Sequence, residues 1–126
     1  MLMNKIISTD KAPKAIGPYS QAYQCGNTLY CSGQIAINPE TNEFIGGTIE
    51  EQTEQILKNI GGLLDAAGYG FEDVVKTTCF IADMKDFAVF NSLYEKAFIS
   101  KPARSCVAAK ELPKGALAEI EVIAVK

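Results

Sequence analysis

The sequence predicts an α+β domain in which two helices pack on one face of a mixed β-sheet. The main observation is that the spacing of apolar residues changes along the chain between strand-like and helix-like periods. These changes indicate elements in the order β-β-β-α-β-α-β-β. The chain also shows neither an internal repeat nor a linker, so residues 1–126 are expected to form a single domain.

Three strands are expected before the first helix. The first covers residues 4–8, and a loop rich in proline and glycine separates it from a strand that starts at Gln21. A Gly-Asn pair at positions 26 and 27 predicts a hairpin that leads into a third strand, over 28–35. Gly33 lies inside this strand and indicates either a β-bulge or a point where another group approaches the backbone closely.

The two helices are separated by a strand. Thr48 and Glu51 have the spacing of a capping box, and apolar residues recur at helical spacing behind them, so a helix is expected over 48–67. A run rich in β-branched residues over 74–81 predicts a central strand. The second helix follows Asp86, which is expected to cap it, and an apolar stripe rich in aromatic residues is expected to face the core.

The last two strands are expected over 103–110 and 119–125. In the final strand Glu119 shares a face with apolar residues and the other face is entirely apolar, so burial of both faces is expected, inside the sheet or against another subunit. If these strands paired as a simple hairpin, Arg104 and Glu119 would lie roughly 16 Å apart. A shared ligand therefore requires the last strand to pair elsewhere in the sheet, or a site assembled differently.

Composition and charge disfavour several classes of function. A net charge of −3 with scattered lysines does not suit a nucleic-acid surface. No stretch reaches the roughly 18 apolar residues of a membrane-spanning helix. The four cysteines lack the spacing of a zinc site, and their strand-like surroundings predict reduced, buried thiols in a cytoplasmic protein; they are Cys25, Cys31, Cys79 and Cys106.

The sequence contains no histidine. A Ser-His or Cys-His nucleophile pair is therefore excluded, together with the imidazole general base. Proton transfer would fall to a carboxylate, tyrosine, lysine, cysteine or water.

Two charged residues are candidates for a site. Arg104 begins a strand among small, apolar residues, and its permanently charged fork of donors suits a carboxylate held by two hydrogen bonds. The alternative is an arginine that faces solvent or pairs with Glu119 or Glu121. Glu119 lies either in a cleft, where a raised pKa would suit an acid or base, or at an exposed strand end. The residues alone leave both choices open.

The chain resembles the Rid family (reactive intermediate deaminases, also called YjgF), and in particular its imine-deaminase subgroup. The resemblance covers nearly the whole length, and the block from Pro102 to Glu121 is highly specific. One departure is the segment 98–101, which is about a residue shorter than the family pattern. The matching motifs are AIGPYSQ at 15–21, SGQI at 32–35, VKTT at 75–78, Asp86-Phe87, Asn91, PARSCV at 102–107, LPK at 112–114 and IEV at 120–122.

The resemblance implies a chorismate-mutase-like fold that assembles as a homotrimer, with the sheets around a central barrel, the last strand within the sheet and clefts at the subunit interfaces. The implied activity is that of a 2-iminobutanoate/2-iminopropanoate deaminase. Such an enzyme hydrolyses short 2-imino acids, or enamines such as 2-aminoacrylate, to 2-keto acids and ammonia without metal or cofactor. Pyridoxal-phosphate-dependent serine and threonine dehydratases release these substrates.

The resemblance also assigns roles to residues. Arg104 would bind the substrate carboxylate, Glu119 would orient water and move protons, and Tyr19 would close the cleft from across the interface. The other residues implied to contact substrate are Ser32 and Gly33 through the backbone, Asn91, and Cys106 as a neutral wall.

Two other functional classes stay open at this point. The same carboxylate site would serve a regulatory protein that senses 2-keto acids without turnover. Some family members are described as ribonucleases or inhibitors of translation, and the acidic balance and missing histidine disfavour that reading.

Overall fold

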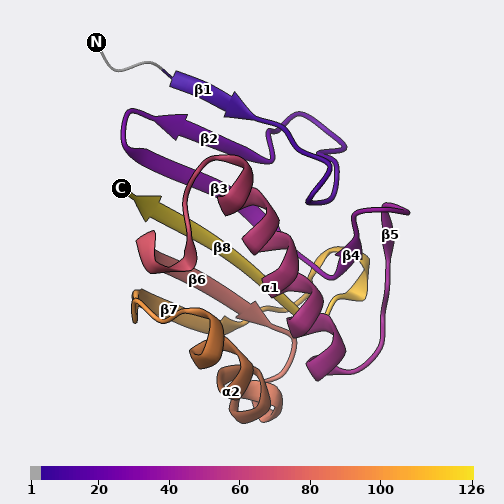
Figure 1. Ribbon diagram of the computed structural model, residues 1–126. Coiled ribbons are helices and arrows are strands. Elements are labelled where there is room, and N and C mark those ends of the chain that lie inside the picture. Colours follow the sequence, from indigo (N-terminus) through magenta and orange to yellow (C-terminus); the bar gives the residue numbers. More distant parts are fainter. Residues whose placement is uncertain (1–3) are drawn as a thin grey trace.

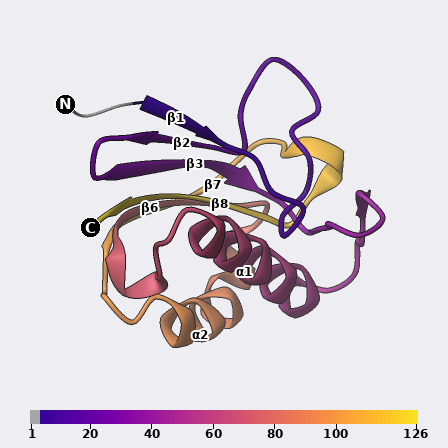
Figure 2. The same cartoon turned by 45° about the horizontal axis from the view of Figure 1, so that its top comes forward.

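The computed structural model describes residues 4–126 of the chain. Two α-helices, α1 and α2, lie on the same side of a six-stranded sheet (Figures 1 and 2). The predicted α+β architecture is therefore confirmed. The helices and strands are β1 Asn4–Ile7, β2 Ala22–Cys25, β3 Thr28–Gln34, β4 Ile37–Asn38, β5 Glu43–Phe44, α1 Ile49–Ala66, β6 Val74–Ile81, α2 Phe87–Ala97, β7 Ala103–Ala108 and β8 Ala118–Val125. Single 3₁₀ turns form η1 Phe71–Asp73, η2 Met84–Asp86 and η3 Pro113–Gly115.

The last strand lies in the middle of the sheet. The strand order is β1-β2-β3-β8-β6-β7, and β8 runs antiparallel to both β3 and β6. β7 is parallel to β6 and forms one edge. Because β6 lies between β7 and β8, the last two strands do not form a hairpin. A separate two-stranded ribbon, β4 with β5, follows β3.

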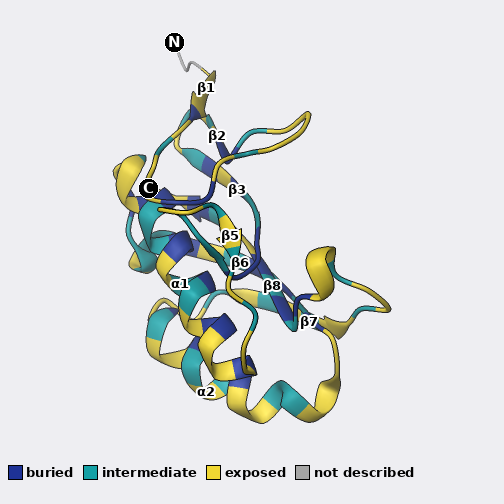
Figure 3. Cartoon of the chain, turned by 90° about the vertical axis from the view of Figure 1, so that its right-hand side faces the viewer, coloured by how far each residue is buried: buried dark blue, intermediate teal, exposed yellow. Residues whose placement is uncertain are grey.

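Along β8, buried residues alternate with half-buried or exposed ones, so its two faces differ in burial; Figure 3 colours each residue of the chain by its burial. Ala118, Ile120, Val122 and Ala124 are almost completely buried beneath the helices. The other face, which carries Glu119 and Val125, is half-buried or exposed. A single chain therefore covers one face of this strand, and covering the second would need another subunit.

Local sequence signals predicted each end of the first helix to within one residue of its observed position, Ile49–Ala66. The Thr48 hydroxyl accepts a hydrogen bond from the Glu51 backbone N–H at 3.2 Å, and the Thr48 backbone N–H donates to the Glu51 carboxylate at 3.0 Å. Gly68 follows the helix with a φ of 82°, a conformation that favours glycine. The expected capping box and glycine stop are both present.

The prediction that the Asp86 side chain caps the second helix is wrong. Asp86 occupies the N-cap position, but its side chain makes no capping hydrogen bond. The chain already turns in η2, where Asp83 accepts a hydrogen bond from the Lys85 backbone N–H at 2.9 Å. The aromatic stripe behaves as expected, since Phe90, Tyr94 and Phe98 are buried.

The four cysteines are free thiols in different environments. Cys31 and Cys79 are buried, as expected. Cys25 is exposed at the end of β2, and Cys106 is half-buried on the edge strand β7, so the expectation of uniformly buried thiols is wrong. No helix among residues 4–126 is long and apolar enough to cross a membrane.

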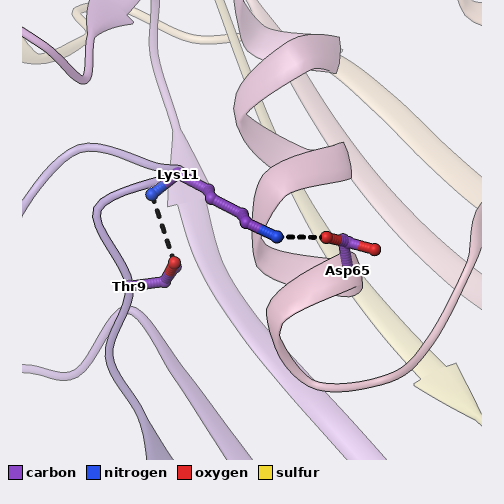
Figure 4. A network of polar contacts seen from close by, with 3 residues as sticks. All are labelled: Thr9, Lys11 and Asp65. Carbon is purple, nitrogen blue, oxygen red and sulfur yellow. Dashed lines mark hydrogen bonds and ion pairs between the residues drawn. The ribbon is translucent and has the colours of Figure 1, made fainter.

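The segment between β1 and β2 packs closely against α1. The Lys11 backbone N–H donates to the Thr9 hydroxyl at 3.1 Å, and the Lys11 ammonium pairs with Asp65 of α1 (Figure 4). A Cβ atom on Gly62 of α1 would overlap the Lys11 carbonyl oxygen. Gly62 therefore permits this approach, which holds the segment against the helix.

Replacing two neighbouring glycines of α1 should have different effects on stability. Gly62→Ala forces the Lys11 backbone away and should cost about 1–3 kcal/mol. In Gly61→Ala the new Cβ meets only the Phe71 ring, at 3.3 Å, so the gain in helix propensity should leave stability unchanged or raised by up to about 1 kcal/mol. Urea unfolding at one protein concentration measures both, and equal effects would contradict the close approach at Gly62.

Candidate functional site

Arg104 is held by one stripe of α2. Its Nη1 donates to the Asn91 Oδ1 at 2.6 Å. Its guanidinium carbon lies 4.6 Å from the centre of the Tyr94 ring and 5.4 Å from that of Phe87. Phe87, Asn91 and Tyr94 are four and three residues apart, so they share a helix face. The guanidinium is therefore held in place by the neutral amide oxygen of Asn91 and by two aromatic rings.

Arg104 has no carboxylate partner within residues 4–126. The ion pair formed in this part of the chain joins Lys11 to Asp65, on another part of the surface. The alternative in which Arg104 pairs with Glu119 or Glu121 is therefore wrong. A half-buried guanidinium bounded by aromatic rings and supported by a neutral amide keeps its full charge for an external anion.

A hollow of about 670 Å³ opens beside this arginine. Its walls include Asn91 and Tyr94 of α2 and Pro102 before β7. Glu95 of α2 and three residues of the segment 98–101 complete the lining; the three are Phe98, Ile99 and Lys101. The segment that is expected to be shorter than the family pattern therefore borders the same hollow as the arginine.

Glu119 lies on the opposite face of the sheet, over Gly33. A Cβ atom on Gly33 would overlap the Glu119 carboxylate, and the register of β3 against β8 shifts between Cys31 and Gln34. Both expectations for Gly33 are therefore met, because it lies in a bulge and a carboxylate approaches its backbone. The approaching group is the chain's own Glu119.

The environment of Glu119 favours its protonated form. Burial raises the pKa of the Glu119 carboxyl above its usual range, and the negative charge of Glu121, on the same strand face, raises it further. Glu119 is half-buried, so it is not a fully exposed strand end. A carboxyl in this state can exchange a proton closer to neutral pH than an exposed glutamate.

Glu119, Tyr19, Ser32 and Gly33 line one hollow of about 690 Å³. Tyr19 enters it from the loop before β2 and is 54% exposed. The Ser32 hydroxyl donates to the Ser20 carbonyl at 2.6 Å, and the Ser32 N–H donates to the Gln21 carbonyl at 3.0 Å. Ser32 therefore uses its donors to hold the Tyr19 loop, and the expected approach of its backbone to a ligand stays a prediction.

Cys106 lies two residues after Arg104 on β7, beside Cys79 of β6. Burial raises the pKa of the Cys106 thiol, and the Arg104 charge opposes that shift only partly. The thiol is therefore neutral near pH 7, and its expected place in the wall of the site stays a prediction. Cys106 borders neither of the two hollows.

One chain does not bring Arg104 and Glu119 together. Arg104 pairs with Thr77 of β6, whose buried hydroxyl is bonded to Tyr94 beneath α2 at 2.7 Å. Glu119 pairs with Phe80, three residues further along β6, and faces away from the helices. From strand geometry the two Cα atoms lie about 14 Å apart. The predicted residues therefore form two half-sites: Arg104 with Asn91, and Glu119 with Tyr19, Ser32 and Gly33.

Sequence reasoning missed the contribution of Phe87 and Tyr94. Both were expected to be core residues, and each also contacts the Arg104 guanidinium. The sequence did contain a signal for this contribution. Asn91 is a polar residue at helical spacing between Phe87 and Tyr94, in a stripe that is otherwise apolar.

The fold and half-sites define a small α+β protein with a candidate site for a carboxylate-bearing ligand. Residues 9–126 match the family described as endoribonuclease L-PSP. A mouse 2-iminobutanoate/2-iminopropanoate deaminase is 48% identical over 126 residues, covering 99% of this chain and 93% of the mouse protein. The crystal structure of a proposed endoribonuclease from Thermotoga maritima is 51% identical, with a TM-score of 0.95 and 98% of each chain covered. That of TdcF from E. coli with bound serine is 42% identical, with a TM-score of 0.91, and covers 97% of this chain and 98% of TdcF. The chain belongs to this family, which is the Rid or YjgF family.

Changing the neutral acceptor of Arg104 into a charged one should weaken binding of small carboxylates. In Asn91→Asp the new carboxylate would pair with the guanidinium within the chain. An internal charge-assisted bond of about 1.5–3 kcal/mol should raise the Kd for 2-ketobutanoate by about tenfold or more. Asn91→Ala is the control, because it removes the support and leaves the charge free. Calorimetric titration measures both, and an Asp variant that binds as tightly as the Ala variant would contradict the role of a neutral acceptor.

Proposed function

We propose that the protein is a 2-imino acid deaminase that hydrolyses 2-iminobutanoate, 2-iminopropanoate and related enamines to 2-keto acids and ammonia. The observation that carries the proposal is the guanidinium of Arg104, which is fixed in place without a carboxylate partner in the described chain. Support comes from the deaminase activity for which the mouse relative is named and from the serine bound to TdcF, an amino acid with an α-carboxylate.

The active site would be shared between two copies of the chain. Arg104 and Asn91 of one copy would bind the substrate carboxylate, and Tyr19 and Glu119 of the next copy would complete the cleft. This arrangement follows from the opposite orientation of Arg104 and Glu119, because no small ligand reaches both in one chain. A homotrimer with the open sheet faces inward would satisfy it. The exposed apolar residues on that face support burial by other copies; they are Tyr23, Tyr30, Val107 and Val125.

The residues suit hydrolysis of a protonated imine. The two-bond clamp of Arg104 would hold the carboxylate and thereby fix the imine carbon. Glu119 would accept a proton from water as its oxygen attacks that carbon, which gives a carbinolamine. Transfer of this proton to nitrogen would then make ammonia the leaving group, and Glu119 would take the hydroxyl proton as the carbonyl forms and pass it to ammonia. The iminium ion and one water yield one 2-keto acid and one ammonium ion, so no redox partner is required.

The composition of the chain argues against ribonuclease activity. A net charge of −3 does not favour binding of a polyanion, and the absence of histidine leaves no imidazole acid or base.

A coupled assay tests the proposal. A serine or threonine dehydratase generates the imine, and 2-keto acid formation is followed with and without this protein. Arg104→Ala should lower kcat/KM by about 10²–10⁴-fold, because two charge-assisted bonds of about 1.5–3 kcal/mol each are lost. Arg104→Lys keeps the charge without the planar fork, so its kcat/KM should lie between that of the wild type and that of Arg104→Ala.

Mixing two inactive variants tests the shared site within the same assay. Glu119→Gln should be inactive alone, as Arg104→Ala is. After subunit exchange in equal amounts, about one quarter of the sites in a cyclic assembly would combine an intact Arg104 with an intact Glu119. Activity should return to about that fraction, and no return in mixed oligomers would contradict the shared site. A wild-type protein that binds 2-ketobutanoate without accelerating hydrolysis would replace the deaminase by a regulatory binding protein.

The acidic limb of the pH profile should depend on Glu121. Glu119 must be ionised to take a proton from water, so kcat/KM should fall as pH drops through its raised pKa. Glu121→Gln removes one of the causes of that raised pKa, so the acidic limb should move to lower pH. Glu43→Gln is the control: this exposed carboxylate on β5 is not among the groups that raise the pKa of Glu119, so the change should leave the limb in place. An unmoved limb in Glu121→Gln would contradict Glu119 as the titrating base.

A further inference from the structure

Gln21 is a buried amide whose hydrogen bonds all go to backbone groups of the segment before it. It lies just before β2 and is 4% exposed. Its Oε1 accepts from the Thr9 N–H at 2.7 Å. Its Nε2 lies within hydrogen-bonding distance of the carbonyl oxygens of Thr9, Ala12 and Pro13, at 2.9, 3.2 and 2.7 Å. One side chain therefore satisfies a donor and several acceptors of residues 9–13.

These bonds close the base of the loop that carries Tyr19. Residues 9–13 lead into the loop 14–20, and Gln21 ends it, so the amide joins the two ends. The loop itself projects beyond the sheet between β1 and β2 (Figure 2). The second end is fixed to β3 as well, since the Gln21 carbonyl accepts from the Ser32 N–H at 3.0 Å.

Tyr19 itself is lightly held. It is 54% exposed, and its backbone N–H donates to the Gly17 carbonyl at 2.9 Å, inside the same loop. The position of the ring over the Glu119 hollow therefore depends on where the base of the loop is fixed. We propose that Gln21 is a positioning residue of the active site, which acts by fixing the loop that presents Tyr19 to the substrate. The inference rests on the proposed function for its catalytic consequence.

The chemistry of the amide explains why glutamine is required. An amide offers an acceptor and two donors, and the site uses both kinds. A carboxylate at this place would face several carbonyl oxygens without a donor. Methionine has a similar length but would leave the Thr9 N–H and the carbonyl groups without these partners, so the base of the loop would open toward water.

The first test is a double-mutant cycle with a matched control. Gln21→Met should lower kcat/KM in the imine assay by about tenfold to a hundredfold, because small misplacements of a catalytic group have effects of this size. In the Tyr19→Ala background the same change should cause no further loss.

Gln52→Met is the control: Gln52 is 2% exposed and also bonds backbone groups, Gly47 and Leu117, away from the Tyr19 loop. It should retain activity. Equal, additive losses in both backgrounds would assign Gln21 to general stability and overturn the inference.

The second test does not depend on activity. Hydrogen exchange should be at least about tenfold faster at the bonded amides of Lys14 and Tyr19 in folded Gln21→Met, and unchanged there in Gln52→Met. Unchanged exchange at both amides in Gln21→Met would overturn the positioning role. If the wild type fails to accelerate imine hydrolysis, the proposed function falls, and the exchange measurement alone decides whether Gln21 fixes the loop.

Discussion

The antiparallel insertion of β8 between β3 and β6 is the constraint on which the rest of the structure depends. The strand supplies the apolar row beneath the helices on one face and Glu119 on the other. It also separates β7 from β3, so that Arg104 lies at the edge of the sheet beside α2. Because neighbouring side chains of a strand alternate between faces, this single placement decides which charged residues can meet within one chain and which cannot.

Much of the fold was accessible from local signals, for identifiable physical reasons. The capping box of Thr48 and the β-branched run over Val74–Ile81 act through neighbouring residues alone, and both gave correct elements. The capping role of Asp86 was wrong because a 3₁₀ turn had already redirected the chain, and residue type does not reveal that. Cys25 was expected to be buried because it falls in a strand-like run, and residue type does not show that its side chain is exposed where the strand ends.

The site was less accessible, because its geometry is set by strand pairing between distant parts of the chain. Sequence alone identified Arg104 and Glu119 as unusual, but not that they face opposite sides of one sheet. The support of the guanidinium by Asn91 and two aromatic rings depends on the packing of α2 against β7, which no spacing rule predicts. Gly33 shows the limit clearly: the pattern allowed a bulge or a close approach, and the structure contains both.

The exposure of Cys25 makes this thiol a site for selective chemical labelling. Burial raises the pKa of Cys31 and of Cys79 to about 12, so neither forms much thiolate near neutral pH, whereas Cys25 stands in solvent at the end of a strand. Cys25 pairs with Thr28 of β3, which in turn pairs with Val125 of β8. Val125 lies about 20 Å along β8 from Glu119. Because Cys25 shares the open sheet face with Val125, a fluorophore attached there through mild maleimide chemistry would lie where other copies are proposed to pack and would sense their association, away from the neighbourhood of Glu119.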